Sequence, residues 1–146
     1  MSRKRPARGE IFVSHSSRNA AFVERLVRVL HAHGLRTFFS PKHIQGAQQW
    51  HDEIGAALAR CSWFVIVLAP QSVASEWVKR ELVYALQDHR YGGRIVPVIY
   101  KTCDLKKLSW TLSGLEYVDF RKDFDGGCRD LLAIWKLKHR PTGDRR

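Results

Sequence analysis

The sequence predicts a single α/β domain built on a parallel sheet of five strands, with helices on both faces. Short apolar runs of strand length alternate along the chain with longer stripes of apolar residues at helical spacing. One of these runs, residues 63–69, is apolar throughout, as expected for a strand that is covered on both faces. This alternation favours a parallel sheet with right-handed crossovers, and 146 residues are enough for one buried core.

The first half of the chain supplies two strands and two helices. Residues 10–14 form an apolar run, and the polar residues 15–19 lead into a helix with one apolar stripe. Gly34 stands where this helix is expected to stop, because glycine is favoured just beyond a helix end. Residues 35–39 are the second expected strand, and residues 50–61 again carry apolar side chains at helical spacing.

The second half repeats the alternation. The strand over 63–69 is followed by a helix for which Ser75 is the expected N-cap. The inward stripe of this helix is expected to comprise Val78, Leu82, Ala85 and Leu86. Residues 94–100 form a fourth strand, in which Pro97 indicates a bulge or a position near the sheet edge. A short strand over 117–120 and a final helix carry the remaining apolar positions, which include Leu131, Leu132, Ile134, Trp135 and Leu137.

Composition excludes several classes of protein. An apolar content of 45% with 27% charged residues is typical of a globular rather than a disordered chain. No apolar run approaches the roughly 20 residues that a membrane span needs, and no signal peptide is evident, so no membrane partner is expected. The three cysteines form no CxxC pair, which indicates reduced thiols in a cytoplasmic protein and no zinc site.

The net charge of +11 raises the question of nucleic-acid binding. Residues 1–8 carry four Lys or Arg and no acid, and residues 136–146 carry five with one acid, so eight of the eleven charges lie near the two ends. A folded nucleic-acid reader instead gathers its basic residues on one face. We therefore expect basic tails at 1–8 and 139–146 around a domain of residues 9–138, and we do not expect nucleic acid as a partner.

Several chemistries that use parallel α/β sheets lack their motifs here. Neither GxGxxG after the first strand nor GxxxxGK[ST] occurs, which excludes the dinucleotide fingerprint and the phosphate-binding loop. Ala69 and Pro70 stand where a phosphoacceptor receiver domain would need an aspartate. His51-Asp52-Glu53 matches the H-x-E of zinc deaminases, but the required P-C-x-x-C is missing, so no metal site is expected.

Three polar connections are expected to meet at one end of the sheet, because ligands of such sheets bind beyond the carboxyl ends of the strands. They are Ser14–Ser17, residues 40–49, and residues 69–75. The hydroxyls and backbone N–H groups of the first connection suit either a bound anion or simple capping of the helix by Ser16 or Ser17. The third connection leads into the helix that carries Glu81.

Glu81 lacks a basic partner on its own helix. The side chains three and four residues away on either side are aromatic or aliphatic: Trp77, Val78, Tyr84 and Ala85. By contrast, Glu76 has Arg80 four residues on, the ordinary arrangement of a solvated helix face. Glu81 is expected on a face that borders the buried stripe. Two interpretations stay open, a functional acid or a boundary carboxylate that hydrogen-bonds a loop while the tryptophan packs in the core.

Three segments together resemble the TIR (Toll/interleukin-1 receptor) domain. IFVSHSS at residues 11–17 is similar to its first strand and Ser-His or Ser-Tyr turn, and LRTFFSPKHIQGAQQW at residues 35–50 to its second strand and BB loop. FVIVLAPQSVASEWVKREL at residues 64–82 is similar to its third strand and to the helix that bears W-x-x-x-E. The resemblance covers residues 9–137 and implies a flavodoxin-like fold with a five-stranded parallel sheet.

The resemblance also implies a site. Some TIR domains cleave NAD+ at the nicotinamide–ribose bond, and their essential residue is the glutamate of W-x-x-x-E, which corresponds to Glu81, with Trp77 as its tryptophan. The resemblance further implies a nucleotide cleft lined by Phe12, Ser14, His15, Ser16, Ser40, Lys42, Trp50 and Trp77. Many members have an aspartate after the second strand, where this chain has Ser40 and Pro41.

The functional prediction is an NAD+-consuming enzyme with Glu81 as its catalytic carboxylate and with neither metal nor cofactor. The expected products are ADP-ribose or a cyclic or conjugated form of it. The resemblance to bacterial members implies anti-phage defence, self-association through TIR–TIR contacts, and a separate effector protein that responds to the product. The alternative is a non-enzymatic adaptor that acts by TIR–TIR assembly or host-signalling mimicry, and a basic-tailed nucleic-acid binder is the third possibility.

Overall fold

The computed structural model describes residues 9–39 and 47–141. Its strands are β1 (Glu10–Ser14), β2 (Arg36–Phe39), β3 (Trp63–Leu68), β4 (Ile95–Ile99) and β5 (Val118–Asp119). Its α-helices are α1 (Ala20–Ala32), α2 (Ala47–Arg60), α3 (Pro70–Val73), α4 (Glu76–Gln87) and α5 (Phe124–Ala133). Short 3₁₀ helices are η2 (Ser17–Asn19), η3 (His89–Tyr91), η4 (Leu105–Lys107) and η5 (Trp110–Gly114).

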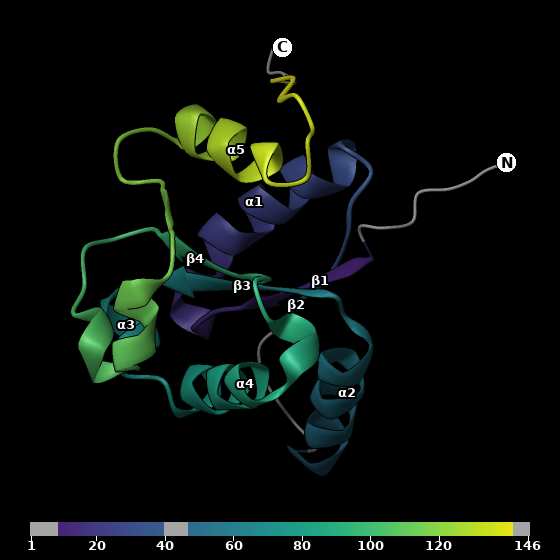
Figure 1. Cartoon of the computed structure of the whole chain (residues 1–146), viewed down its shortest axis with the longest axis vertical. Helices are drawn as coiled ribbons and strands as arrows, with labels where there is room; N and C mark the ends of the chain where they lie inside the picture. The colour runs from purple at the N-terminus through teal and green to yellow at the C-terminus, as the bar shows by residue number, and fades with distance from the viewer. Residues whose placement is uncertain (1–8, 40–46, 142–146) are drawn as a thin grey trace, which may run out of the picture.

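The five strands form one parallel sheet in the order β2-β1-β3-β4-β5. Figure 1 shows α1 and α5 above this sheet and α2 and α4 below it. The predicted fold class, a flavodoxin-like five-stranded parallel sheet with helices on both faces, is therefore confirmed.

Each face of the sheet has its own core, because successive strand residues point to opposite sides. Ile11, Val13, Val65 and Val67 pack toward α1 and α5. Phe12, Phe64, Ile66 and Leu68 pack toward α2 and α4. These side chains are all 0–1% exposed, so the central strands are buried on both faces, as the continuous apolar run of β3 predicts.

Two predicted helix ends are confirmed by the backbone. Gly34 follows α1 with a φ of +84°, a conformation that glycine adopts without a steric penalty. At the start of α4, the hydroxyl of Ser75 accepts a hydrogen bond from the Val78 N–H at 3.2 Å. The second cap matters for the site, because it fixes where α4 begins and therefore which of its side chains face the sheet.

Two expectations about side-chain placement are corrected. The buried residues of α4 are Val78, Glu81, Leu82 and Ala85, whereas Leu86, expected in the core, is 39% exposed. Successive helix residues are 100° apart, so when Glu81 faces the sheet, Leu86, five residues later, lies at the edge of the buried stripe and is open to solvent. Glu81 therefore lies within the buried face rather than beside it.

The expected position of Pro97 near the sheet edge is confirmed. β4 neighbours the two-residue edge strand β5, whose partners are Val98 and Ile99. Pro97 precedes those partners, so its missing N–H interrupts no pairing with β5. The register with β3 runs without interruption through Pro97, so there is no bulge.

The expected tail at residues 1–8 and most of the expected tail at 139–146 lie outside the described residues. Within the described ranges, no helix has the length and apolar character needed to cross a membrane. All three cysteines are free thiols, with Cys61 and Cys128 buried and Cys103 half-buried.

Candidate active site

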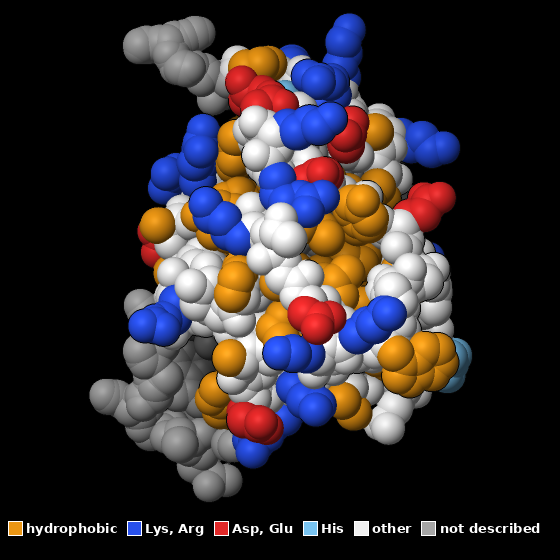
Figure 2. Space-filling view, turned by 90° about the vertical axis from the view of Figure 1, so that its left-hand side faces the viewer, with side chains coloured by type: hydrophobic (Ala, Val, Ile, Leu, Met, Phe, Trp, Pro, Cys, Tyr) orange, Lys and Arg blue, Asp and Glu red, His pale blue; other side chains and the backbone are white. Residues whose placement is uncertain are grey.

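The carboxyl ends of the strands lie on the left of the molecule in Figure 1, and Figure 2 views that side directly. In that view, Lys and Arg side chains are spread among areas of hydrophobic surface. Exposed cations follow three of the strands, Arg18 after β1, Lys101 after β4 and Lys122 after β5.

Glu81 is joined by a hydrogen bond to the last residue of the first strand. Its side chain is only 5% exposed, and the Ser14 hydroxyl donates a hydrogen bond to Glu81 Oε1 at 2.5 Å. Ser14 is the last residue of β1 and is 1% exposed. On the helix, Glu81 stands between Val78 and Leu82, which are fully buried. A strand end and a helix that are 67 residues apart in the chain thus meet at one carboxylate.

Burial sets the electrostatics of Glu81. Desolvation raises the pKa of Glu81 from 4.5 to about 7, and the hydrogen bond from Ser14 opposes this shift. The ion pairs among the described residues are Arg60–Glu10, Arg90–Asp88 and Arg121–Asp119, and none of them includes Glu81. The carboxyl group is therefore divided between its protonated and ionised forms near neutral pH, which suits a group that responds to the charge of a ligand.

Phe12 and His15, which lie on either side of Ser14 in the chain, pack on opposite faces of the sheet. Phe12 has no exposed surface and stacks on the Phe64 ring at a centroid distance of 5.6 Å. It therefore supports Ser14 from the core and lines no open surface in this conformation. The His15 ring lies 6.0 Å from the ring of Phe39, which packs against the α1/α5 core, on the face opposite Glu81.

Ser16 and Asn19 order the connection between β1 and α1. The Ser16 hydroxyl accepts a hydrogen bond from the Arg18 N–H at 3.2 Å, which is the expected capping role, and anion binding by this connection stays a prediction. Asn19, which the sequence analysis did not single out, is 6% exposed and donates from Nδ2 to Gln71 Oε1 at 3.3 Å. Its buried Oδ1 has no hydrogen-bond donor among the described residues. The only sequence signal for Asn19 is that it is polar and follows a strand end.

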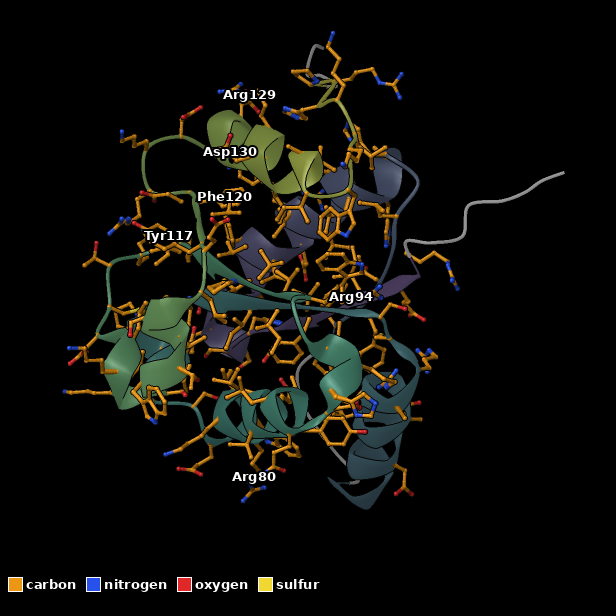
Figure 3. All side chains as sticks on the ribbon, in the orientation of Figure 1. Arg80, Arg94, Tyr117, Phe120, Arg129 and Asp130 are labelled. Atoms are coloured by element: carbon orange, nitrogen blue, oxygen red, sulfur yellow. The ribbon has the colours of Figure 1, made fainter. Side chains whose placement is uncertain are left out.

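Trp77 lies in the first turn of α4, on the side that borders solvent. It is 39% exposed, and the Arg80 guanidinium lies 5.7 Å from its ring centroid. Figure 3 shows Arg80 on the side of α4 that faces away from the sheet. In one of the two interpretations of this helix Trp77 packs in the core, and that placement is wrong, because the helix turns Glu81 inward and Trp77 to the boundary with solvent. The contact of Trp77 with a nucleotide stays a prediction.

The remaining predicted cleft residues belong to the second loop. Ser40 and Lys42 lie outside the described residues, and Trp50 lies on the backbone of α2 with its side chain outside the description. Of the predicted site residues, the structure thus brings Ser14 and Glu81 into contact, with Phe12 packed on the same face of the sheet. Among the described residues, no group of three His, Cys, Asp or Glu side chains is placed to hold a metal ion.

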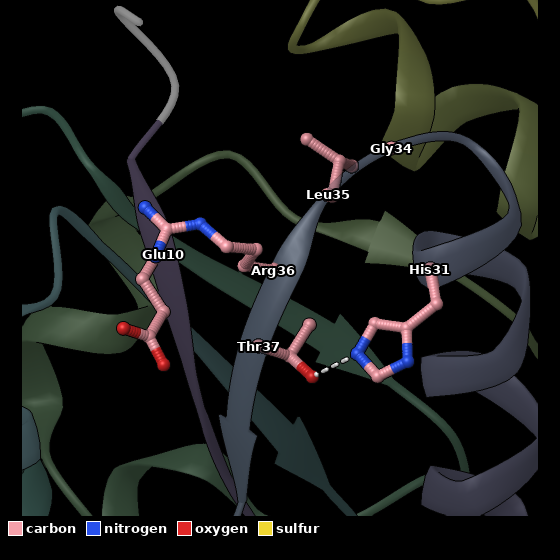
Figure 4. A pocket seen from close by; sticks show the side chains of 6 residues that line it. All are labelled: Glu10, His31, Gly34, Leu35, Arg36 and Thr37. Carbon is pink, nitrogen blue, oxygen red and sulfur yellow. Dashed lines mark hydrogen bonds between the residues drawn. The ribbon is translucent and has the colours of Figure 1, made fainter.

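An open recess of about 520 Å³ lies at the opposite end of the molecule, between the start of β1 and the end of α1 (Figure 4). Its lining includes Glu10, His31, Arg36 and Thr37. Three of these side chains already have partners, because Glu10 pairs with Arg60 at 2.8 Å and His31 Nε2 lies 2.9 Å from the Thr37 hydroxyl, while Arg36 is exposed. The recess therefore offers a hollow without a buried, unpaired charge.

Comparison with known proteins agrees with this architecture. A family model described as "TIR domain" matches residues 11–132. The TIR domains of the activated Roq1 resistosome, which recognises the pathogen effector XopQ, superpose with a TM-score of 0.70 at 19% identity, over 87% of this chain and 99% of that one. The TIR domain of the Toll-related receptor TRR-2 from Hydra magnipapillata gives 0.66 at 17% identity, over 86% and 91%. At these identities the two structures show the fold alone, and the search of curated protein sequences gave no significant match.

Proposed function

The chain belongs to the TIR domain family, and from that premise we propose that it cleaves NAD+ at the nicotinamide–ribose bond, with Glu81 as the catalytic carboxylate. The observation that carries the proposal is the environment of Glu81. A carboxylate that is 5% exposed at the carboxyl end of the sheet, with no ion-pair partner among the described residues, is unfavourable for stability. Its presence is explained if a ligand supplies the missing positive charge.

NAD+ supplies that charge in the reaction itself. The nicotinamide ring is a cation in the substrate and leaves as a neutral molecule, so its departure needs little acid assistance. The positive charge then develops on the ribose, which becomes oxocarbenium-like. A carboxylate beside the ribose stabilises this charge, and the stabilisation is stronger where protein excludes water.

The raised pKa of Glu81 fits this role. Only the ionised carboxylate opposes the developing charge, and near pH 7 a substantial fraction is protonated. A cationic ring that binds nearby favours the ionised form and lowers the pKa of Glu81. We therefore expect activity to rise with pH through about 7, since the ionised fraction rises over the same range.

The fate of the ribose cation determines the product. Attack by water gives ADP-ribose, attack by an atom of the same nucleotide gives a cyclic isomer, and attack by another acceptor gives a conjugate. On this proposal the product is a signal in anti-phage defence that a separate effector protein reads, and the domain self-associates through TIR–TIR contacts. The Roq1 relative was solved as an assembly, which supports self-association as part of the proposal.

A second candidate function is a non-enzymatic TIR adaptor. Large apolar side chains on α4 favour it, because Trp77, Val83, Tyr84 and Leu86 are each about 40% exposed, with values of 39%, 43%, 39% and 39%. Such side chains are suited to contacts between domains. An adaptor, however, leaves the burial of Glu81 without an explanation.

The test is to incubate the concentrated protein, in crowded solution, with NAD+ and to measure nicotinamide by chromatography and the second product by mass spectrometry. Glu81→Gln keeps the size of the side chain and removes its charge, and should lower nicotinamide release by at least about 100-fold. Glu76→Gln, an exposed acid on the same helix, is the matched control and should keep wild-type activity. Equal release from wild type and Glu81→Gln, or no release from concentrated wild type, would contradict the proposal and favour the adaptor.

A further inference from the structure

We propose that Ser14 is a positioning residue that divides the two oxygens of Glu81, holding one and leaving the other for the substrate. The inference rests on the proposed function for its chemistry and on the geometry of two buried side chains for its support. It replaces the expectation, drawn from resemblance, that Ser14 itself contacts the nucleotide.

The contact between the two side chains is asymmetric. The Ser14 hydroxyl donates to Glu81 Oε1 at 2.5 Å, and Glu81 Oε2 accepts no hydrogen bond from the described residues. A carboxylate held at one oxygen has a fixed plane, so the direction of its second oxygen is fixed as well. Glu81 Oε2 is therefore the atom that faces the ribose hydroxyls and the developing charge.

The scaffold behind Ser14 is rigid. β1 lies between β2 and β3, and Ser14 is in register with Ile66 in β3. Two residues earlier, Phe12 stacks on Phe64 beneath the same face of the sheet. A hydroxyl carried by the end of a central strand has less freedom than one carried by a loop, which is what positioning a reacting group requires.

The burial of Ser14 argues against direct contact with substrate. The residue is 1% exposed, and its one hydroxyl proton is used in the hydrogen bond to Glu81. A substrate hydroxyl could replace it only by breaking that bond. In the simpler arrangement, Ser14 stays hydrogen-bonded to Glu81 Oε1 throughout the reaction and the substrate approaches Glu81 Oε2.

Within the described part of the chain, no charged or titratable neighbour takes the place of Ser14 in holding Glu81 or in shifting its pKa. β3 and α3, which pack against α4, contain no titratable side chain, and β1 contributes only Glu10 at its far end. The remaining neighbour, η3 (His89–Tyr91), follows the other end of α4, where Arg90 pairs with Asp88 and the Tyr91 hydroxyl donates to the Leu58 carbonyl. On α2 the described acids Asp52 and Glu53 are exposed, as are Lys79 and Arg80 on α4 itself. The other titratable residue near Ser14 is His15, which turns to the opposite face of the sheet. Burial and the Ser14 hydrogen bond are accordingly the two causes that shift the pKa of Glu81.

The kinetic experiment compares Ser14→Ala with Ser14→Thr. Ser14→Ala should lower kcat by roughly 10- to 100-fold with KM changed less than about threefold, because it removes a charge-assisted hydrogen bond to the carboxylate rather than to the substrate. The acidic limb of its pH–rate profile should move up by roughly one pH unit, since the removed bond favoured the ionised form. Ser14→Thr keeps the hydroxyl and should restore both. A rise in KM with an unmoved acidic limb would show that Ser14 binds substrate and would overturn the inference.

A titration without NAD+ separates this inference from the proposed function. In protein labelled with ¹³C at the glutamate carboxyls, the Glu81 signal is identified by its loss in Glu81→Gln, and its midpoint should rise in Ser14→Ala. Ser16→Ala, which removes a capping hydroxyl of the same connection, should leave that midpoint in place. A raised midpoint in a protein that does not cleave NAD+ would leave Ser14 as the residue that holds Glu81 and would reject only the proposed function. An unchanged midpoint would reject the inference whether or not NAD+ is cleaved.

Discussion

At the amino end of the sheet, the partly buried acids Glu10 and Asp88 are paired with arginines, whereas near the carboxyl end Glu81 is buried without an arginine partner among the described residues. Glu10 contacts Arg60 at 2.8 Å, and Asp88 contacts Arg90 at 2.9 Å. Hydrogen bonds from Arg90 lower the pKa of Asp88, while burial raises the pKa of Glu81. Pairing is possible at the carboxyl end too, because Asp119 contacts Arg121 there. Among the described acids, Glu81 is the one that is buried, and a chain selected only for stability would not retain a buried acid without a cationic partner.

The recess and the carboxylate that lacks a cationic partner among the described residues lie at different ends of the sheet. The recess at the amino end is an open hollow of about 520 Å³ (Figure 4), but Arg60 already neutralises its carboxylate. The carboxylate whose charge is not neutralised lies at the other end, held by a single hydroxyl. A hollow becomes a site only where polar groups are left to act on a ligand. Substitutions at the two ends should therefore differ in their effect on the free energy of unfolding.

The largest difference in stability should come from Glu81→Gln. The pKa of Glu81 is raised from 4.5 to about 7 in the folded state, so its contribution to stability is fully present below about pH 4.5 and is lost as pH rises through about 7. Wild type should therefore lose about 3 kcal/mol relative to Glu81→Gln between pH 4.5 and pH 8. Urea unfolding of both proteins across this range measures the difference. A difference that stays constant with pH would mean that Glu81 is not a desolvated acid.

A smaller effect is expected from Tyr91→Phe at the amino end. Tyr91 is fully buried, and its hydroxyl donates to the Leu58 carbonyl at 2.6 Å. That carbonyl also accepts from Arg90 Nη2 at 2.9 Å, so it keeps a partner when the hydroxyl is removed. The loss should be about 1 kcal/mol in urea unfolding, with NAD+ cleavage unchanged. A large loss of activity in this variant would show that the two ends are coupled.

The smallest effect is expected from Glu10→Gln. The Arg60 side chain in this ion pair is 51% exposed, and exposed pairs contribute between a few tenths and about 1 kcal/mol, less in high salt. Thermal unfolding at low and high ionic strength measures this contribution. A salt-independent loss above about 2 kcal/mol would contradict the description of this pair as an exposed surface interaction.

The sequence predicted the sheet, its strands and two helix ends, because these depend on patterns a few residues long. It misplaced Leu86, and one of its two interpretations misplaced Trp77, because the exact direction in which a helix stripe points depends on what the helix packs against. It identified Glu81 as lacking a helical partner, but Ser14, which holds it, is 67 residues away in the chain. Asn19 escaped notice for the same reason, because its burial comes from packing near Gln71 on another connection. Ser40 and Lys42 lie outside the described residues, so their assignment to the cleft stays a prediction.

The most direct test of the account takes one carboxylate from each end of the sheet and measures nicotinamide release from NAD+ at pH 8. Glu81→Gln should reduce the rate by at least about 100-fold, because it removes the charge that faces the ribose. Glu10→Gln should stay within about twofold of wild type, because its charge is already neutralised by Arg60. Equal rates in the two variants would contradict the account and leave this TIR domain without a catalytic carboxylate at Glu81.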